Sequence, residues 1–158
     1  MPTGDAKDAR RPVRYRRSAV ARPPGLDLAE DGDGMLTLLI AEDDPRMRAW
    51  LRTVLAHTGA SIHEAGTGWE VLSLLATEVR FDLVISDVRM PSPSGLQALA
   101  MARTAGSEVP FLLISAFGDQ QLRAQAEVLR ASFLDKPFSA RELISYVERL
   151  AATSAEAP

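Results

Sequence analysis

The sequence predicts a doubly wound α/β fold, in which helices cover both faces of a parallel β-sheet. Short apolar runs alternate with amphipathic segments from Leu36 to about Leu150. The run from Leu83 to Ile85 is apolar on both faces, which is typical of a buried parallel strand. The proline, serine and glycine residues at 91–95 cannot continue that strand, because proline lacks the ladder donor and these residue types favour turns. Five strands that alternate with five helices then imply parallel pairing and right-handed crossovers.

The first strand is expected from Leu36 to Ala41, directly before three acidic residues at 42–44. Asp44 suits the N-cap of the following helix and Pro45 its first position, while Gly59 is a stop signal. The apolar face of this helix is expected to lie in the core and consists of Met47, Trp50, Leu51, Val54 and Leu55.

A short second strand is expected near Ser61 to Glu64. The next helix is opened by Thr67, with Glu70 three residues later completing a capping box. Trp69 on this helix is expected to be partly buried. Four further apolar side chains are expected to face inward, namely Val71, Leu72, Leu75 and Val79.

The C-terminal half continues the same alternation after the strand that ends at Asp87. Ser139 and Glu142 form a second capping box, which opens the last helix. Four elements are expected between the Asp87 strand and this last helix: a helix from about Gly95 to Thr104, a strand from Val109 to Ser115, a helix near Asp119 to Arg130 and a strand from Ser132 to Asp135.

Composition divides the 158 residues into one domain and two tails. Residues 1–34 combine proline, glycine and charge with little apolar periodicity, so a disordered tail, basic and then acidic, is expected there. Its arginines either contact an acidic partner or membrane surface or are simply solvated. Residues 35–153 are expected to form the domain and 154–158 a short C-terminal tail, and an alternative translation start at Met35 is conceivable.

Charge and residue usage exclude several classes of function. The net charge is −3, and residues 7–22 hold seven basic residues against a single acidic one, so the rest of the chain is acidic and direct DNA binding is not expected. The absence of cysteine excludes disulfides and thiolate metal sites. No segment reaches the roughly 18 apolar residues of a membrane span, and the basic N-terminus lacks an apolar signal region. A cytoplasmic location is therefore expected.

Polar residues end four of the five expected strands. Glu42 and Asp43 follow the first strand, Asp87 ends the third, Ser115 ends the fourth, and Lys136 follows the fifth. Open α/β sheets bind their ligands at the carboxyl ends of the strands. We therefore expect these side chains to lie together at one edge of the sheet.

Three carboxylates in one pocket raise each other's pKa unless a cation is present. Mg²⁺ suits such a pocket, because it prefers oxygen ligands and usually takes one or two carboxylates plus a phosphate oxygen. Lys136 and the Ser115 hydroxyl can bind phosphate oxygens, and an aspartate can attack phosphorus as a nucleophile. An acidic cluster at a sheet edge is also compatible with a solvated cap.

Four spaced groups of residues combine these features: Glu42-Asp43, Asp87 with Met90-Pro91 and Gly95, Ser115-Ala116, and Lys136-Pro137-Phe138. In this spacing the chain resembles the response-regulator receiver domains of two-component signalling, from Leu36 to about Leu150. The resemblance implies a flavodoxin-like five-stranded sheet with strand order 2-1-3-4-5.

The resemblance also implies roles for the acidic residues. Asp87 would be the phosphoacceptor, Asp43 a direct Mg²⁺ ligand, and Glu42 a second acidic residue that acts largely through water. Arg89 would contribute its backbone carbonyl to the metal. Asp44 lies outside this set and is expected to act only as the helix cap.

Ser115 and Lys136 would, by the same resemblance, hold the phosphoryl oxygens. Phe133 would be the aromatic residue whose rotamer follows Ser115 toward the phosphate. The phosphodonor would be a sensor histidine kinase or a histidine phosphotransfer protein. A downstream partner protein would bind the face formed by the fourth helix, fifth strand and fifth helix.

The sequence departs from the family pattern at two places. Leu129 and Arg130 stand where many members carry a glycine before the fifth strand, so the fourth helix is expected to end differently. Ser94 stands where an acidic residue is frequent. Neither departure touches the chemical residues.

Three other functions fit the sequence less well. An aspartyl phosphatase or mutase would need a second aspartate two residues after the nucleophile, and Arg89 occupies that place. Nucleotide binding lacks support, since neither a GxGxxG motif nor a P-loop occurs. A receiver-like module that is never phosphorylated is disfavoured because every chemical position is filled. The chain ends eight residues after Leu150, so a stand-alone receiver that is not an enzyme is expected.

Overall fold

The computed structural model describes residues 35–116 and 120–155. The predicted tail at 1–34 and residues 156–158 lie outside the described residues. Five parallel strands form one sheet in the order β2-β1-β3-β4-β5, which confirms the predicted fold class and strand order. The strands are β1 (Thr37–Ala41), β2 (Ser61–Ala65), β3 (Leu83–Asp87), β4 (Phe111–Ser115) and β5 (Ser132–Asp135).

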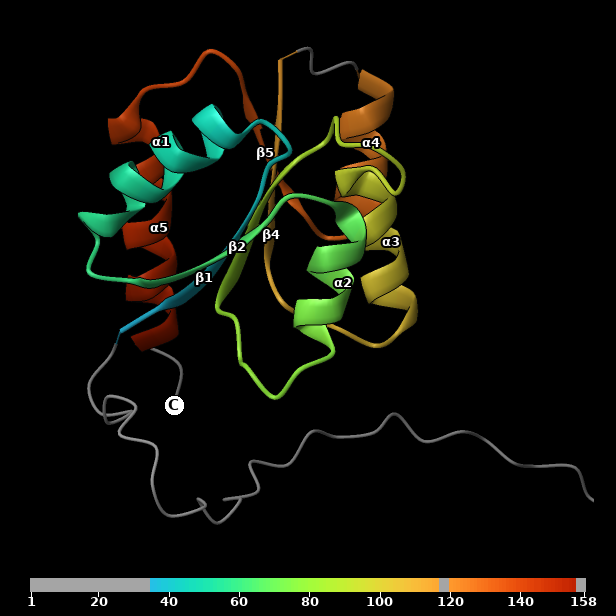
Figure 1. Ribbon diagram of the computed structural model, residues 1–158, viewed down its shortest axis with the longest axis horizontal. Helices are drawn as coiled ribbons and strands as arrows, with labels where there is room; N and C mark the ends of the chain where they lie inside the picture. The colour runs from blue at the N-terminus through green and yellow to red at the C-terminus, as the bar shows by residue number, and fades with distance from the viewer. Residues whose placement is uncertain (1–34, 117–119, 156–158) are drawn as a thin grey trace, which may run out of the picture. The chain divides into compact units, whose positions relative to one another are not determined.

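Five helices connect the strands and cover both faces of the sheet. They are α1 (Pro45–Ala56), α2 (Gly68–Leu75), α3 (Gly95–Thr104), α4 (Gln120–Val128) and α5 (Ala140–Ala155). Helices α1 and α5 lie on one face, and α2, α3 and α4 lie on the other (Figure 1). Because α5 continues to Ala155, the helix extends beyond residue 153, and the division into a 35–153 domain with tails stays a prediction.

The core has two halves, one on each face of the sheet. Alternate residues of the strands supply them, so that Leu39 and Val84 face the α2–α4 side while Leu38 and Leu83 face the α1–α5 side. Strands β3 and β4 are buried along their whole length, as expected for central strands of a sheet covered on both faces.

The helix starts agree largely with the expected capping residues. The Asp44 carboxylate accepts a hydrogen bond from the Arg46 N–H at 2.8 Å, which confirms it as the cap of α1. Ser139 and Glu142 form the predicted capping box at α5. At α2, Thr67 accepts from the Glu70 N–H, but the Glu70 carboxylate accepts from the Gly66 N–H, so only half of the predicted capping box is correct.

Three burial predictions in the first two helices are wrong. Trp50 is 39% exposed, because it lies about 100° around the helix from Leu51, at the edge of the apolar face. The centre of its ring lies 5.7 Å from the centre of the Phe138 ring. Trp69 is 58% exposed rather than partly buried. Val79 is also exposed, because α2 ends at Leu75 before the apolar period reaches it.

The fourth strand begins two residues later than predicted. Pro110 has no N–H to donate to a ladder, although its carbonyl accepts from the Val84 N–H at 2.9 Å. The strand therefore begins at Phe111 instead of Val109.

Helices α3 and α4 end in the same geometry with different residues. The α3 end has Gly106 in the left-handed region, with a hydrogen bond from the Ser107 N–H back to the Ala102 carbonyl. At the α4 end Arg130 has φ of 55°, and the Ala131 N–H donates to the Ala126 carbonyl. Both are Schellman motifs, which favour glycine at the left-handed position. The predicted helix to Arg130 thus stops at Val128.

A half-buried arginine, Arg103, ties the ends of α3 and α4 together. The Arg103 Nε donates to the Leu129 carbonyl at 2.9 Å, and its Nη1 donates to the carbonyls of Ser107 and Val109, each at 2.9 Å. The guanidinium also lies 5.5 Å from the centre of the Phe111 ring. Burial lowers the pKa of Arg103, and these three carbonyls offset that cost by accepting its charge-assisted hydrogen bonds.

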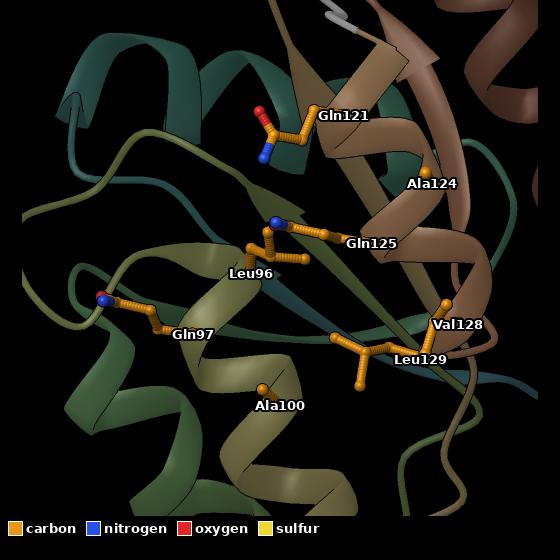
Figure 2. A pocket seen from close by; sticks show the side chains of 8 residues that line it. All are labelled: Leu96, Gln97, Ala100, Gln121, Ala124, Gln125, Val128 and Leu129. Atoms are coloured by element: carbon orange, nitrogen blue, oxygen red, sulfur yellow. The ribbon is translucent and has the colours of Figure 1, made fainter.

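An open groove of about 600 Å³ lies between the N-terminal half of α3 and the facing side of α4. Figure 2 shows Leu96, Gln97 and Ala100 on the α3 side and Gln121, Ala124, Gln125, Val128 and Leu129 on the α4 side. Within α4, whose residues are all described, Ala126 alone is buried. Apolar packing therefore holds α4 less firmly than α3, which buries Gly95, Ala98, Leu99 and Ala102.

Candidate functional site

The register of the sheet brings the predicted polar residues to one edge. Ala41 pairs with Ser86 in the next strand, so Glu42 follows directly beside Asp87. Asp87 in turn pairs with Ile114, and Ser115 is the next residue of β4. The Lys136 N–H donates to the Ser115 carbonyl at 2.8 Å, which extends the β4–β5 pairing by one residue. Four strands thus deliver their terminal residues to a common site.

Three carboxylates meet at this edge. One oxygen from each of Glu42, Asp43 and Asp87 lies within 4.8 Å of the others. Glu42 and Asp87 are buried, with 3% and 8% exposure, whereas Asp43 is exposed. The cluster therefore combines a desolvated floor with one carboxylate that faces water.

Lys136 supplies the cation next to these carboxylates. Its Nζ lies 2.8 Å from an Asp87 oxygen and 3.6 Å from a Glu42 oxygen. Burial alone would lower the pKa of Lys136, but the hydrogen bond and charge of Asp87, together with Glu42, raise it above its usual value. Lys136 is therefore held as a fixed positive charge on Asp87.

The Glu42 carboxyl is strongly perturbed. Burial, aided by the neighbouring Asp87 carboxylate, raises its pKa to about 7, although the hydrogen bond from the Asp44 N–H opposes the rise. The Arg48 side chain fixes the Glu42 backbone by donating to its carbonyl at 2.7 Å. The Glu42 carboxyl therefore gives up its proton less readily than an exposed glutamate, mainly because it is buried.

The remaining predicted residues surround Asp87 in different ways. The Arg89 backbone N–H donates to an Asp87 oxygen at 2.8 Å. Ser115 is fully buried at the end of β4. Phe133 lies on β5, two residues before the residue that pairs with Ser115, and its ring faces α4 rather than the carboxylates.

The described fold and site agree with a known family. Residues 38–148 match the response regulator receiver domain family. The chain belongs to this family. It is the receiver domain of a two-component response regulator, and phosphorylation and Mg²⁺ binding are typical of the family.

Curated relatives and solved structures agree with this assignment. The response regulator MprA of Mycolicibacterium vanbaalenii is 33% identical over 114 residues, which cover 72% of this chain and 49% of MprA. The response regulator protein FleR of Pseudomonas aeruginosa is 38% identical over 114 residues, covering 71% of this chain and 24% of FleR. The receiver domain of the Francisella response regulator 1452 superposes with a TM-score of 0.70 at 27% identity, covering 75% of this chain and 98% of that structure. The chain thus spans half or less of these two curated relatives.

Two glycines of the receiver domain allow the loop after Asp87 to fold back onto the site. A Cβ at Gly95 would lie 2.1 Å from the Asp87 carbonyl oxygen, and a Cβ at Gly68 would lie 2.3 Å from the Pro93 carbonyl oxygen. The Gly95 N–H also donates to the Val88 carbonyl at 3.1 Å. Because the backbone approaches so closely at both positions, a side chain there would force the loop to shift.

The carboxylate cluster suits a Mg²⁺ ion. Its donors are all carboxylate oxygens, and one of the three residues, Asp43, is exposed to water. A cation next to Glu42 would favour its ionised form, which burial disfavours. Mg²⁺ is bound by few carboxylates and keeps several waters, which an open cluster of this kind permits. Glu42, Asp43 and Asp87 are therefore the residues of the receiver domain that could hold the ion.

Sequence reasoning missed several residues that shape the receiver domain. Ser94 caps α3 in a full capping box with Gln97, a signal that was readable from the serine and the glutamine three residues later. Arg103 and Arg123 contact partners that are distant in sequence, so no local pattern indicates them.

Among the described residues, no helix has the length and apolar character needed to span a membrane.

Proposed function

We propose that Asp87 is the phosphoacceptor of a cytoplasmic two-component phosphorelay. It would take a phosphoryl group from a phosphohistidine of a sensor histidine kinase or a histidine phosphotransfer protein. The observation that carries the proposal is the position of Lys136 Nζ at 2.8 Å from Asp87, inside the cluster of three carboxylates. A carboxylate that is fixed between a cation and acidic metal-binding partners has the surroundings that phosphoryl transfer needs.

The proposed step is a displacement at phosphorus. An Asp87 carboxylate oxygen attacks the phosphorus atom, the P–N bond to the donor histidine breaks, and its electron pair returns to the imidazole nitrogen. Lys136 and the Ser115 hydroxyl would hold the phosphoryl oxygens, while the Arg89 N–H orients the carboxylate. When bound by Glu42, Asp43, Asp87 and the Arg89 carbonyl, Mg²⁺ would neutralise the charge that gathers on the phosphoryl oxygens.

The output of the phosphorylated domain would pass through a partner protein. Ser115 would move toward the phosphoryl group, and the Phe133 ring would turn into the space that it leaves. This movement would change the face formed by α4, β5 and α5, in a two-state shift that phosphorylation biases. Single-domain organisation, expected from the sequence, stays a prediction.

A labelling experiment tests the proposal. Wild-type protein incubated with acetyl phosphate and Mg²⁺ should gain the mass of one phosphoryl group, and chelation of Mg²⁺ should prevent the gain. Asp87→Asn should not be labelled. Asp82→Asn is the matched control, because Asp82 precedes the same strand at the opposite end of the sheet, where it accepts from the Thr37 N–H. Full labelling of Asp87→Asn would refute the assignment.

A further inference from the structure

Helix α4 packs on the sheet with few apolar side chains, so polar contacts contribute to its position. The groove that separates it from α3 leaves its neighbouring flank unpacked, and Ala126 is its one buried side chain (Figure 2). Its C-terminal end is fixed by Arg103 through the Leu129 carbonyl. In its N-terminal half Leu122 packs partly buried against the core, and a second contact reaches β5.

Arg123 provides this contact with β5. Its guanidinium carbon lies 4.8 Å from the centre of the Phe133 ring, and its Nη2 forms an ion pair with Asp135. The Arg123 and Asp135 side chains are 41% and 52% exposed, so water screens their ion pair and makes it weak. The cation–π contact with the Phe133 ring adds to this weak ion pair. One side chain of α4 thus holds two residues of β5 at once.

These two residues of β5 are close to the phosphorylation chemistry. Asp135 pairs with Ser115 in the sheet, and the next residue, Lys136, binds the Asp87 carboxylate. Phe133 is the residue whose ring would have to move if Ser115 were drawn toward a phosphoryl group. The guanidinium of Arg123 lies over that ring, so the ring cannot turn away without losing the contact.

We propose that Arg123 is a latch that holds the Phe133 ring under α4 and so favours the unphosphorylated arrangement of the receiver domain. The inference rests on the proposed function, because it takes Phe133 as the residue that moves. A cation–π contact at an exposed site corresponds to a factor of about two to five in an equilibrium constant, which sets the size of the effect. Arg123 is a positioning residue and does not touch the reacting atoms.

The position of the ring can be measured without any phosphorylation. With 4-fluorophenylalanine incorporated at position 133 alone, the fluorine NMR signal reports the environment of the ring. In Arg123→Gln the population of a second ring environment should rise about two- to fivefold over wild type. Arg52→Gln is the matched control. Arg52 is also an exposed arginine in an ion pair, and its partner Glu64 lies in β2, the edge strand at the other end of the sheet from β5. Identical signals in wild type and Arg123→Gln would overturn the proposal.

A second readout separates the latch from a purely structural role. The initial rate of labelling by acetyl phosphate with Mg²⁺ should rise about two- to fivefold in Arg123→Gln and stay at the wild-type value in Arg52→Gln. In a Phe133→Leu background, Arg123→Gln should no longer change the rate, because the ring that the arginine holds is gone. A rate increase that persists in that background would overturn the latch, since it would arise from charge or stability alone.

The two measurements distinguish the latch from the function on which it rests. Absence of any labelling in the wild type contradicts the proposed phosphoacceptor, and the fluorine signal still decides whether Arg123 holds the ring. Normal labelling with an Arg123-independent fluorine signal contradicts the latch and leaves the phosphoacceptor intact.

Discussion

Burial and the Asp87 carboxylate raise the pKa of Glu42 from 4.5 to about 7, which makes the folded protein sensitive to pH when no metal is present. Below pH 4.5 this group is protonated in both the folded and the unfolded chain. Between pH 4.5 and about 7 the unfolded chain releases the proton while the folded protein retains it. By linkage, the free energy of unfolding contributed by Glu42 therefore falls as the pH rises through this window.

Replacement of Glu42 should remove this pH dependence. We expect Glu42→Gln to abolish a loss of unfolding free energy on the order of 2–3 kcal/mol between pH 4.5 and 7. Urea denaturation at several pH values with a metal chelator measures it. Glu64→Gln is the control, because Glu64 pairs with Arg52 and Arg48 away from Asp87, and it should leave the slope unchanged. The same fall in wild type and Glu42→Gln would contradict the assignment.

The adjacent residues Asp43 and Asp44 should differ sharply in what they contribute. Asp43→Ala should weaken Mg²⁺ binding roughly tenfold or more, because it removes one of the three carboxylates that could hold the ion. Asp44→Ala should leave the affinity almost unchanged and lower the free energy of unfolding by about 1 kcal/mol, because Asp44 caps α1. Calorimetric Mg²⁺ titration and denaturant unfolding give the two quantities. Equal loss of affinity in both variants would show that the distinction is wrong.

At the scale of elements, the ends of α3 and α4 show how a departure from the family pattern is accommodated. Both ends need one residue with left-handed backbone, and α3 has Gly106 there while α4 has Arg130 with φ of 55°. A non-glycine residue in this region costs roughly 1–2 kcal/mol. The fourth helix nevertheless ends in the same hydrogen-bond pattern, because Arg103 and the Schellman bonds hold the turn.

Exchange of the residues at these two positions should shift stability in opposite directions. Arg130→Gly should raise the free energy of unfolding by about 0.5–1 kcal/mol. Glycine relieves the backbone strain of the folded state, and its greater entropy in the unfolded chain cancels part of that gain. Gly106→Ala should lower it by about 1 kcal/mol, although a Cβ there meets nothing within 4 Å. Denaturant unfolding measures both. Ala105→Gly, at a right-handed position, should only destabilise, and stabilisation there would contradict the explanation.

Most element positions follow from local patterns, and the errors occur where tertiary contacts decide. Asp44 with Pro45, and Ser139 with Glu142, open their helices as predicted, because capping depends on neighbouring residues. Val79 continues the apolar spacing of α2, which wrongly predicts that it faces inward. The helix ends at Leu75, and apolar spacing alone does not indicate where a helix ends. Trp50 is exposed although its spacing predicts burial, because apolar character does not distinguish the centre of a helix face from its edge.

At the scale of the whole molecule, the parallel sheet explains why the site could be predicted. Parallel strands place their carboxyl ends at one edge, so Glu42, Asp87 and Lys136 converge without any knowledge of side-chain packing. The groove beside α4 and the contact of Arg123 with Phe133 could not be predicted, because they depend on how two helices sit on the same face. The residues of the site can therefore be predicted from their positions at the ends of successive strands. The contacts that hold α4 depend on tertiary packing, which the sequence pattern does not indicate.

The most direct test of the phosphoacceptor is to locate the phosphoryl group in the labelled protein. Borohydride reduces an aspartyl phosphate to homoserine, and peptide mass spectrometry then identifies the position. After incubation with acetyl phosphate and Mg²⁺, we predict homoserine at position 87 and unmodified aspartate at positions 43 and 44, because Lys136 contacts the Asp87 carboxylate. Homoserine at either of the other two positions, or labelled protein with position 87 unmodified, would contradict the central claim.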